Sequence, residues 1–347
     1  MSGQYEDEFA AHWWAAVAAV TRAVGDLEVA EDAAQEACAV ALAQWPSQGV
    51  PANPRGWLIG TARHKAVDRL RREAHRVGKE TEAMREASTP PPAGSWAAST
   101  DDELALIFTC CHPALDPAVR VALTLRAVCG LTTAEIAAAF LLPESTIAQR
   151  LVRAKRKIRQ AAITFRVPAP ADLPARLSAV LRVVYLVFTE GHTARSGETI
   201  VRGHLCDQAI RLARALADLL PDEPEVSGLL ALLLLTDARR DARIGPDGEP
   251  VLLAEQDRTR WDRGMIANGE EVLERALRQG RPGAYQLHAA IAACHSAAAS
   301  AEETDWREIA LLYGELIRYE PTPVVEANRA VAVAMSEGPA AGLVILD

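Results

Sequence analysis

Residues 131–159 constrain the fold most, because they have the pattern of two short helices joined by a tight turn. Thr132 and Glu135 have the spacing of a capping box, in which each side chain bonds the backbone amide of the other residue, so a helix should begin there. Residues 141–143, Leu-Leu-Pro, then indicate a turn. Beyond the turn, apolar residues recur every three or four positions, at Ile147, Leu151, Ala154 and Ile158. This spacing predicts a second helix with one buried stripe, and therefore a helix-turn-helix.

The composition extends the helical prediction to the whole chain. Hydrophobic residues make up 50% of the sequence but aromatic residues only 5%, and alanine recurs throughout. This balance favours closely packed helices over sheets, which are rich in β-branched and aromatic residues. We therefore predict an all-α protein, and its 347 residues suit more than one domain.

Two proline-rich breaks divide the sequence. Residues 74–100 lose helical periodicity and contain three successive prolines, and a second joint follows at 167–170. We expect a first module at 1–75, a linker at 76–100, a second module at 101–166 and a helical extension at 171–347. Helix pairs in the extension have a weak tetratricopeptide-like pattern. We also expect the extension to continue beyond residue 347.

Charge is distributed unevenly along the chain. The formal net charge is −9, yet residues 1–166 hold 19 Lys+Arg and 19 Asp+Glu, so the acidic surplus lies entirely in the second half. Within the first half, residues 150–159 contain six basic residues and no acid. A nucleic-acid partner is therefore compatible with the first half despite the negative total.

The second helix of the helix-turn-helix has the side chains that read DNA. Opposite its apolar stripe, hydroxyl, amide and guanidinium groups can contact base edges in a major groove, and the following cations can hold phosphates. The predicted DNA-binding residues are Ser145, Thr146, Gln149, Arg150, Arg153, Lys155, Arg156 and Lys157. A plain amphipathic helix with a solvated cationic face remains the alternative.

The first module combines an acidic helix with a basic one. Acidic residues crowd 26–36, whereas the helix expected at 55–73 is rich in arginine. This polarity would allow one face to meet a positively charged protein and another to meet DNA. A solvated acidic helix is the simpler interpretation of the charge alone.

Three stretches of the first module, 31–36, 53–58 and 62–72, resemble region two of the extracytoplasmic-function sigma factors, and the helix-turn-helix resembles their region four. The resemblance covers about residues 8–162 and implies binding to RNA polymerase core, at the β′ clamp and β flap, and to promoter DNA. It assigns polymerase binding to Asp26, Glu31, Asp32, Gln35 and Glu36. It assigns the minus-ten element to Asn53, Arg55, Arg63, His64, Asp68, Arg69, Arg71 and Arg72, and the minus-thirty-five element to the helix-turn-helix.

The extension resembles the tetratricopeptide-like C-terminal domain of one sigma-factor subgroup. Segments 238–243, 256–262, 304–306 and 328–332 carry the likeness, which implies control by this domain and a regulatory protein that binds it. The predicted interdomain or regulatory residues are Arg239, Arg240, Asp257, Arg258, Trp261, Asp305, Trp306, Asn328 and Arg329. The alternating charges at 239–262 also suggest an ion network.

Other function classes find little support in the sequence. No nucleophile with a base and no phosphate-binding loop stands out, so we expect neither an enzyme nor a cofactor. The cysteines form no C-x-x-C pair, which argues against a metal site. The N-terminus lacks a signal-peptide pattern and no apolar run approaches ~18 residues, so we expect a cytoplasmic protein without a membrane partner. The alternative function is a helix-turn-helix regulator or adaptor that acts without polymerase core.

Overall fold

The computed structural model describes residues 5–77, 100–140, 142–169, 171–192, 200–245 and 249–346. Within these ranges the regular elements are helices, and the one β-type contact is an isolated bridge between Ile244 and Pro250. The all-α prediction is therefore confirmed. None of the described helices is long and apolar enough to cross a membrane. The chain divides into two compact units, Met1–Val183 and Val184–Asp347, and helix α9 (Leu173–His192) contains the boundary.

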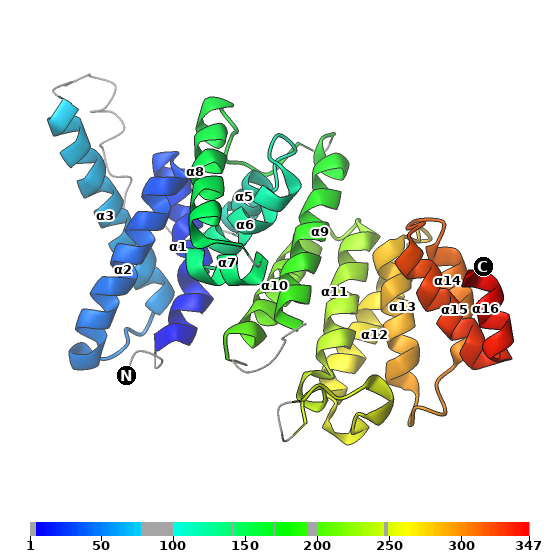
Figure 1. The fold of residues 1–347 in the computed structure, drawn as a ribbon. Helices are drawn as coiled ribbons and strands as arrows, with labels where there is room; N and C mark the ends of the chain where they lie inside the picture. Colours follow the sequence, from blue (N-terminus) through cyan, green and yellow to red (C-terminus); the bar gives the residue numbers. More distant parts are fainter. Residues whose placement is uncertain are drawn as a thin grey trace. The chain divides into compact units, whose positions relative to one another are not determined.

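Three helices of the first module lie side by side (Figure 1): α1 (Glu6–Val24), α2 (Leu27–Gln48) and α3 (Pro54–Val77). Alanines and valines at 15–20 are almost fully buried, because their small side chains let the helices approach closely. The chain passes from α1 to α2 through Gly25, and the carboxylate of Asp26 caps the new helix by accepting from the amides of Glu28 and Val29.

The second module contains α5 (Thr100–Cys110), α6 (Pro117–Ala127), α7 (Thr133–Phe140) and α8 (Glu144–Gln160). The predicted capping box forms, since Glu135 Oε2 accepts from the amide of Thr132 at 2.6 Å and Thr132 Oγ1 accepts from the amide of Glu135 at 3.2 Å. The predicted apolar stripe of α8 is buried at all four of its positions. A helix-turn-helix therefore ends this module, with the polar face of α8 opposite its packed face.

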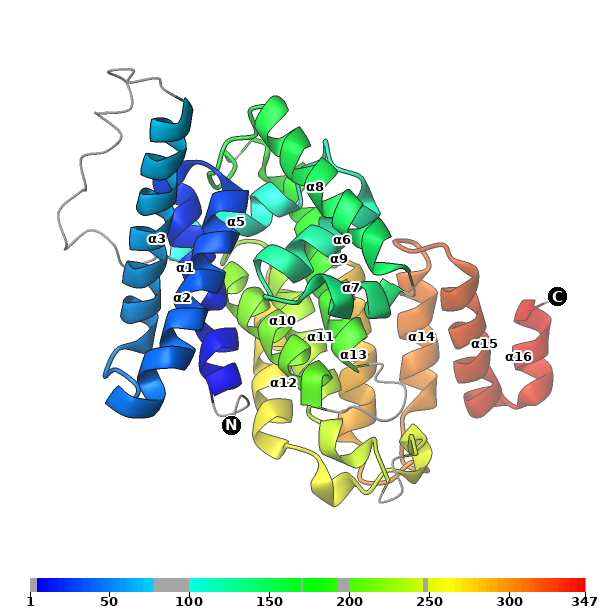
Figure 2. The same cartoon turned by 60° about the vertical axis from the view of Figure 1, so that its left-hand side comes forward.

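The second unit is a succession of neighbouring helices. After α9 come α10 (Ile200–Leu219) and α11 (Pro224–Asp237), and three short 3₁₀ turns follow at Arg240–Ala242, Leu253–Glu255 and Arg258–Arg260. The remaining helices are α12 (Arg263–Leu277), α13 (Ala284–Ala297), α14 (Trp306–Leu316), α15 (Pro323–Glu337) and α16 (Pro339–Leu346). In Figure 2, α14, α15 and α16 follow one another as consecutive antiparallel helices, as a helical-hairpin pattern predicts.

Helix α11 is the centre of the second unit. Its residues 229–235 are all buried, so it is apolar on every side, and it packs against α10, α12 and α13. The approach of α12 is close, because a Cβ at Gly269 would lie only 2.8 Å from Leu235 Cγ. Glycine is therefore required where these two helices cross.

Candidate DNA- and protein-binding surfaces

The predicted DNA-binding residues lie along the unburied face of α8. Thr146 and Arg150 are half-buried, and the others, with Lys155 as the exception, are exposed: Ser145, Gln149, Arg153, Arg156 and Lys157. This surface offers donors, acceptors and cations along one side of a helix that is held rigidly by its buried stripe. It can therefore contact base edges and phosphates.

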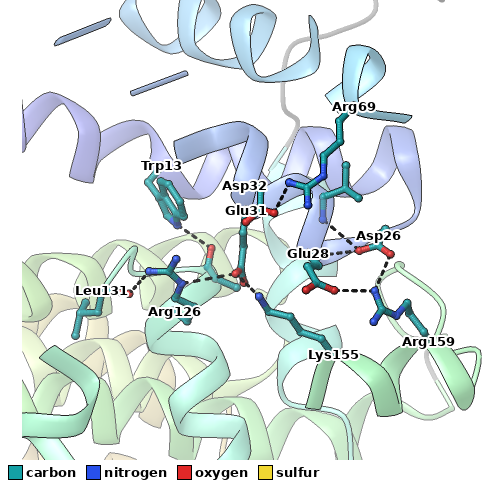
Figure 3. Close-up of polar contacts among 12 residues, drawn as sticks. Trp13, Asp26, Glu28, Glu31, Asp32, Arg69, Arg126, Leu131, Lys155 and Arg159 are labelled. Carbon is teal, nitrogen blue, oxygen red and sulfur yellow. Dashed lines mark hydrogen bonds and ion pairs between the residues drawn. The ribbon is translucent and has the colours of Figure 1, made fainter. Parts of the chain in front are cut away.

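Lys155 points instead toward α2, where it meets Glu31 (Figure 3). Its Nζ lies 2.6 Å from Glu31 Oε2, and Arg126 Nε of α6 lies 3.6 Å from the same oxygen. The Glu31 side chain is 1% exposed, and its other oxygen, Oε1, has no hydrogen-bond partner. Burial raises the pKa of Glu31 even though Lys155 and Arg126 favour its charged form. The two cations thus offset only part of the desolvation of a buried carboxylate.

A second ion pair joins the two modules at the start of α2. Arg159 Nη1 lies 3.1 Å from Asp26 Oδ2 and 2.8 Å from Glu28 Oε2. Burial opposes ionisation of Asp26, but hydrogen bonds from the amides of Val29 and Glu28 and from Arg159 lower its pKa. Asp26 therefore caps α2 and also binds the C-terminal turn of α8.

Neutral contacts extend this junction between the modules. Trp13 Nε1 donates to the carbonyl of Ala127 at 3.2 Å, and Trp14 Nε1 donates to the carbonyl of Glu103 at 3.1 Å. Gly130 has φ +74, in the left-handed region, and it packs closely on Trp13, because a Cβ there would lie 3.0 Å from Trp13 Cγ. The junction is therefore a packed surface in which both indole donors are paired, and the ion pairs of Glu31 and Asp26 lie beside these contacts.

The other predicted polymerase-binding residues stay within the first module. Asp32 pairs with Arg69 of α3, and Glu36 Oε2 lies 3.8 Å from Lys65 Nζ. Gln35 is exposed. Of the five predicted residues, the structure thus brings Asp26 and Glu31 against the second module, and it leaves Gln35 accessible.

The residues predicted to bind the minus-ten element begin at the first turn of α3. Asn53 Oδ1 accepts from the amide of Gly56 at 2.9 Å, and Arg55 Nη2 lies 2.7 Å from Glu103 Oε1 of α5. The nearby Trp57 packs against Trp45, with ring centroids 5.5 Å apart. Further along the helix, Arg63 and Arg69 are half-buried, whereas the remaining four are exposed: His64, Asp68, Arg71 and Arg72.

Sequence reasoning missed the partners that these residues meet across the junction. Arg126, Glu28 and Trp13 were not among the predicted site residues, and Arg159 was expected to hold phosphate. Glu31 and Lys155 are 124 positions apart in the sequence. The only available signal was the presence of an acidic helix and a basic helix in one chain, which does not specify partners.

The predicted regulatory residues of the extension organise its packing. Arg239 and Arg258 lie over the Trp261 ring, with guanidinium carbons 5.9 and 4.6 Å from its centroid. Arg258 Nη1 also donates to the carbonyls of His295 and Ala298, at 2.7 Å each. This set therefore fixes the 3₁₀ segment before α12 against the end of α13.

Two of the remaining residues of that set, Asp257 and Asp305, act as helix caps. Asp257 accepts from the amide of Thr259, and Asp305 caps α14 by accepting from the amide of Glu308, both at 2.9 Å. Trp306 meets the His295 ring edge-on at 5.4 Å. Arg329 lies 3.4 Å from Glu326, and Asn328 is exposed. Of these aspartates, Asp257 belongs to the ion network suggested for 239–262, and it caps backbone amides there instead.

One cluster in the extension has the residue types of a metal site. Ligand atoms of His192, Cys206 and Asp237 lie within 4.8 Å of one another. Both carboxylate oxygens of Asp237 are bound by Arg240, at 2.9 and 2.6 Å, and burial together with Arg243 lowers the pKa of His192 to about 3. A cation would have to displace Arg240 from a site already surrounded by guanidinium groups, so the arrangement favours a hydrogen-bonded structural cluster.

Comparison with known proteins finds three matched segments of the chain. Residues 12–76 match Sigma-70 region 2, residues 105–158 match Sigma-70 region 4, and residues 176–277 match a family of unknown function (DUF6596). The chain is 44% identical to an uncharacterized protein of Rhizobium meliloti, over 96% of this chain and 80% of that protein. It is 31% identical to the probable ECF RNA polymerase sigma factor SigI of Mycobacterium tuberculosis, over 41% of this chain and 50% of that protein. No solved structure matches the chain with significance.

Proposed function

Since this chain belongs to the sigma-70 family, with regions 2 and 4 followed by a C-terminal helical extension, we propose that it binds RNA polymerase core and directs initiation at specific promoters. One observation carries this proposal. The chain pairs a region 4 helix-turn-helix, whose α8 presents an exposed cationic face, with a region 2 bundle that bears its own row of exposed polar and cationic residues on α3. Two DNA-facing surfaces on one chain suit a promoter with two separated elements.

Each surface has a separate proposed role. The helix α8 reads the minus-thirty-five element from a major groove, and its exposed cations hold the flanking phosphates. The first turn of α3 and its arginines bind the minus-ten element, where cations hold the backbone of the separated strand. The acidic residues of α2 bind the β′ clamp, and the second module meets the β flap.

The ion pairs between α2 and α8 support a competition between partners. Lys155 and Arg159 occupy Glu31 and Asp26, which we assign to the β′ clamp. A clamp surface that supplies its own cations would take over these carboxylates and release the two basic side chains toward DNA. Binding to core and binding to the minus-thirty-five element then strengthen each other.

We further propose that the extension controls initiation. Support comes from the acidic surplus, which lies entirely after residue 166 and can mask basic DNA-binding helices. Transcription by the full chain can be compared with that by residues 1–183, which form one compact unit. More transcript from the fragment would mark the extension as inhibitory, and less would mark it as required. Equal transcript would contradict control by the extension.

The affinity of the chain for polymerase core is the measurement that tests the proposal. Gln35 is exposed on α2 among the acidic residues, so Gln35→Arg places a like charge against a cation-bearing clamp and should weaken core binding roughly tenfold. Gln44→Arg is the matched control, since Gln44 is exposed on the same helix outside the assigned set. Fluorescence anisotropy of labelled protein with purified core gives both affinities. Equal affinities would contradict the docking assignment, and no binding by the unaltered chain would contradict the function.

The same geometry favours one alternative function. Because Glu31 is buried against the second module, the alternative is a helix-turn-helix regulator that never meets polymerase. Such regulators bind as dimers that span two half-sites. A dimer on palindromic DNA that shows no affinity for core would favour this alternative over the sigma function.

A further inference from the structure

A cavity lies in the first unit where the chain leaves α8 and enters α9. Its volume is about 230 Å³, far above the ~10–15 Å³ that a single water needs. Three parts of the chain line it: His112 from the turn between α5 and α6, the segment 161–169 after α8, and Asp172 and Arg176 around the start of α9. The cavity thus joins the end of the DNA-reading helix to the helix that leads into the extension.

Positive charge predominates in this cavity. Arg166 and Arg176 line it, and Asp172 is the one carboxylate among the lining residues that the structure describes. Arg176 is anchored because its Nη2 donates to the carbonyl of Phe108 at 2.8 Å. Its Nε is enclosed and has no hydrogen-bond partner.

His112 adds a second donor with a defined orientation. Its Nδ1 accepts from the amide of Ala114 at 3.1 Å, so the proton of the neutral ring lies on Nε2. Burial, together with Arg176 and Arg120, lowers the pKa of His112, and the ring is neutral near pH 7. Thr164 contributes a hydroxyl to the same lining. The polar groups of the cavity are therefore mostly donors.

The end of α8 forms one side of the cavity. Ala162, which lines it, has φ +48 and is the left-handed residue that ends the helix, where the amide of Ile163 donates to the carbonyl of Ile158 at 3.1 Å. This side of the cavity is therefore held in place by the C-terminal hydrogen bonds of α8.

We propose that this cavity binds a small molecule that carries a phosphate or carboxylate group. Arg166 and Arg176 supply the countercharge, and His112 Nε2 and the Thr164 hydroxyl donate to the remaining oxygens. A cation would face two guanidinium groups, and a neutral ligand would leave their charge opposed only by Asp172. Neither the matched families nor the proposed promoter recognition assigns this site. A bound anion would bridge the end of α8 and the start of α9.

Titration of the full chain with two probes, inorganic phosphate and malonate, tests the proposal by calorimetry. One saturable site is expected for at least one probe, and the preferred probe identifies the oxyanion. Arg166→Gln should weaken binding about tenfold, as loss of a charge-assisted hydrogen bond predicts. Asp172→Asn should tighten binding several-fold by removing the opposing charge.

Arg182→Gln is the matched control, because Arg182 is exposed on α9 and does not line the cavity. Arg166 is also exposed, so its replacement leaves the fold intact, and circular dichroism checks this. The proposal is overturned if neither probe binds saturably, or if Arg166→Gln and Arg182→Gln bind both probes equally. Core binding is measured separately, so these outcomes do not depend on the sigma function.

Discussion

Replacing Lys155 with methionine isolates the buried charge at the junction of the two modules. Lys155 is 15% exposed and Glu31 is 1% exposed, so the pair is screened little by water. Methionine keeps the length and packing of the side chain but removes its charge. Glu31 then retains only Arg126, which lies 3.6 Å away and is held by a hydrogen bond to the carbonyl of Leu131.

The expected loss of stability follows from these contacts. Removing one partner of a buried ion pair costs about 3–5 kcal/mol. Because Arg126 still compensates part of the charge, we expect about 2–3 kcal/mol for Lys155→Met. Glu31→Gln should change stability by less than about 1 kcal/mol, since it also removes the carboxylate whose desolvation raises its pKa. The double variant should be nearly as stable as the unaltered chain.

Native-state hydrogen exchange, read on peptides from α2 and α8, measures this effect within one unit of the protein. A loss of about 2–3 kcal/mol corresponds to exchange roughly 30- to 150-fold faster. Lys157→Met is the matched control, because Lys157 is exposed on the same helix. Equal exchange in the Lys155 and Lys157 variants would refute a stabilising role for the buried pair.

Acidification tests the same ion pair independently, because the effect of Lys155→Met should depend on pH in a defined direction. The pKa of Glu31 is raised in the folded protein, so its charge is lost as the pH falls through that folded value. Without that charge, Lys155 has nothing to neutralise. The difference between Lys155→Met and the unaltered chain should therefore shrink in acid, and a constant difference would contradict the assignment.

Three further predictions concern the second module. Gly130→Ala should lower the thermal stability by roughly 1–3 kcal/mol, because φ is +74 and the new Cβ would press on Trp13; an unchanged melting temperature would contradict this. Thr132→Ala should lower the free energy of unfolding by about 1 kcal/mol, because it breaks the capping box with Glu135, and thermal unfolding also measures this loss. Arg156→Ala should reduce the salt dependence of binding to promoter DNA by about one phosphate contact, and an unchanged slope would remove Arg156 from the DNA surface.

Local patterns predicted the elements of this fold well. The capping box at Thr132 and the stripe of α8 could be read from the sequence because both depend on residues within a few positions of one another. The cap that Asp26 forms on α2 depends on equally local contacts, with the amides of Glu28 and Val29. The domain plan was inferred from proline-rich segments, which interrupt helical periodicity, whereas the two compact units of the structure meet at Val183 and Val184, within α9.

Long-range contacts could not be predicted from the sequence patterns. Lys155 and Arg156 are both basic residues of one helix, yet Lys155 is directed to Glu31 and Arg156 is exposed. Helical periodicity gives the face of a residue but not the element packed against that face. Asp257 and Asp305 were assigned regulatory roles, and the structure places them as helix caps, a function that a single aspartate fulfils with nearby backbone amides.

Transcription in vitro tests the central claim most directly. Purified core polymerase is mixed with a library of promoter fragments, with and without the full chain, and the 5′ ends of the transcripts are sequenced. The account predicts defined start sites that appear only with the chain and share two conserved upstream elements. Start sites that do not differ from those of core alone would contradict the assignment of this protein as a promoter-specificity subunit.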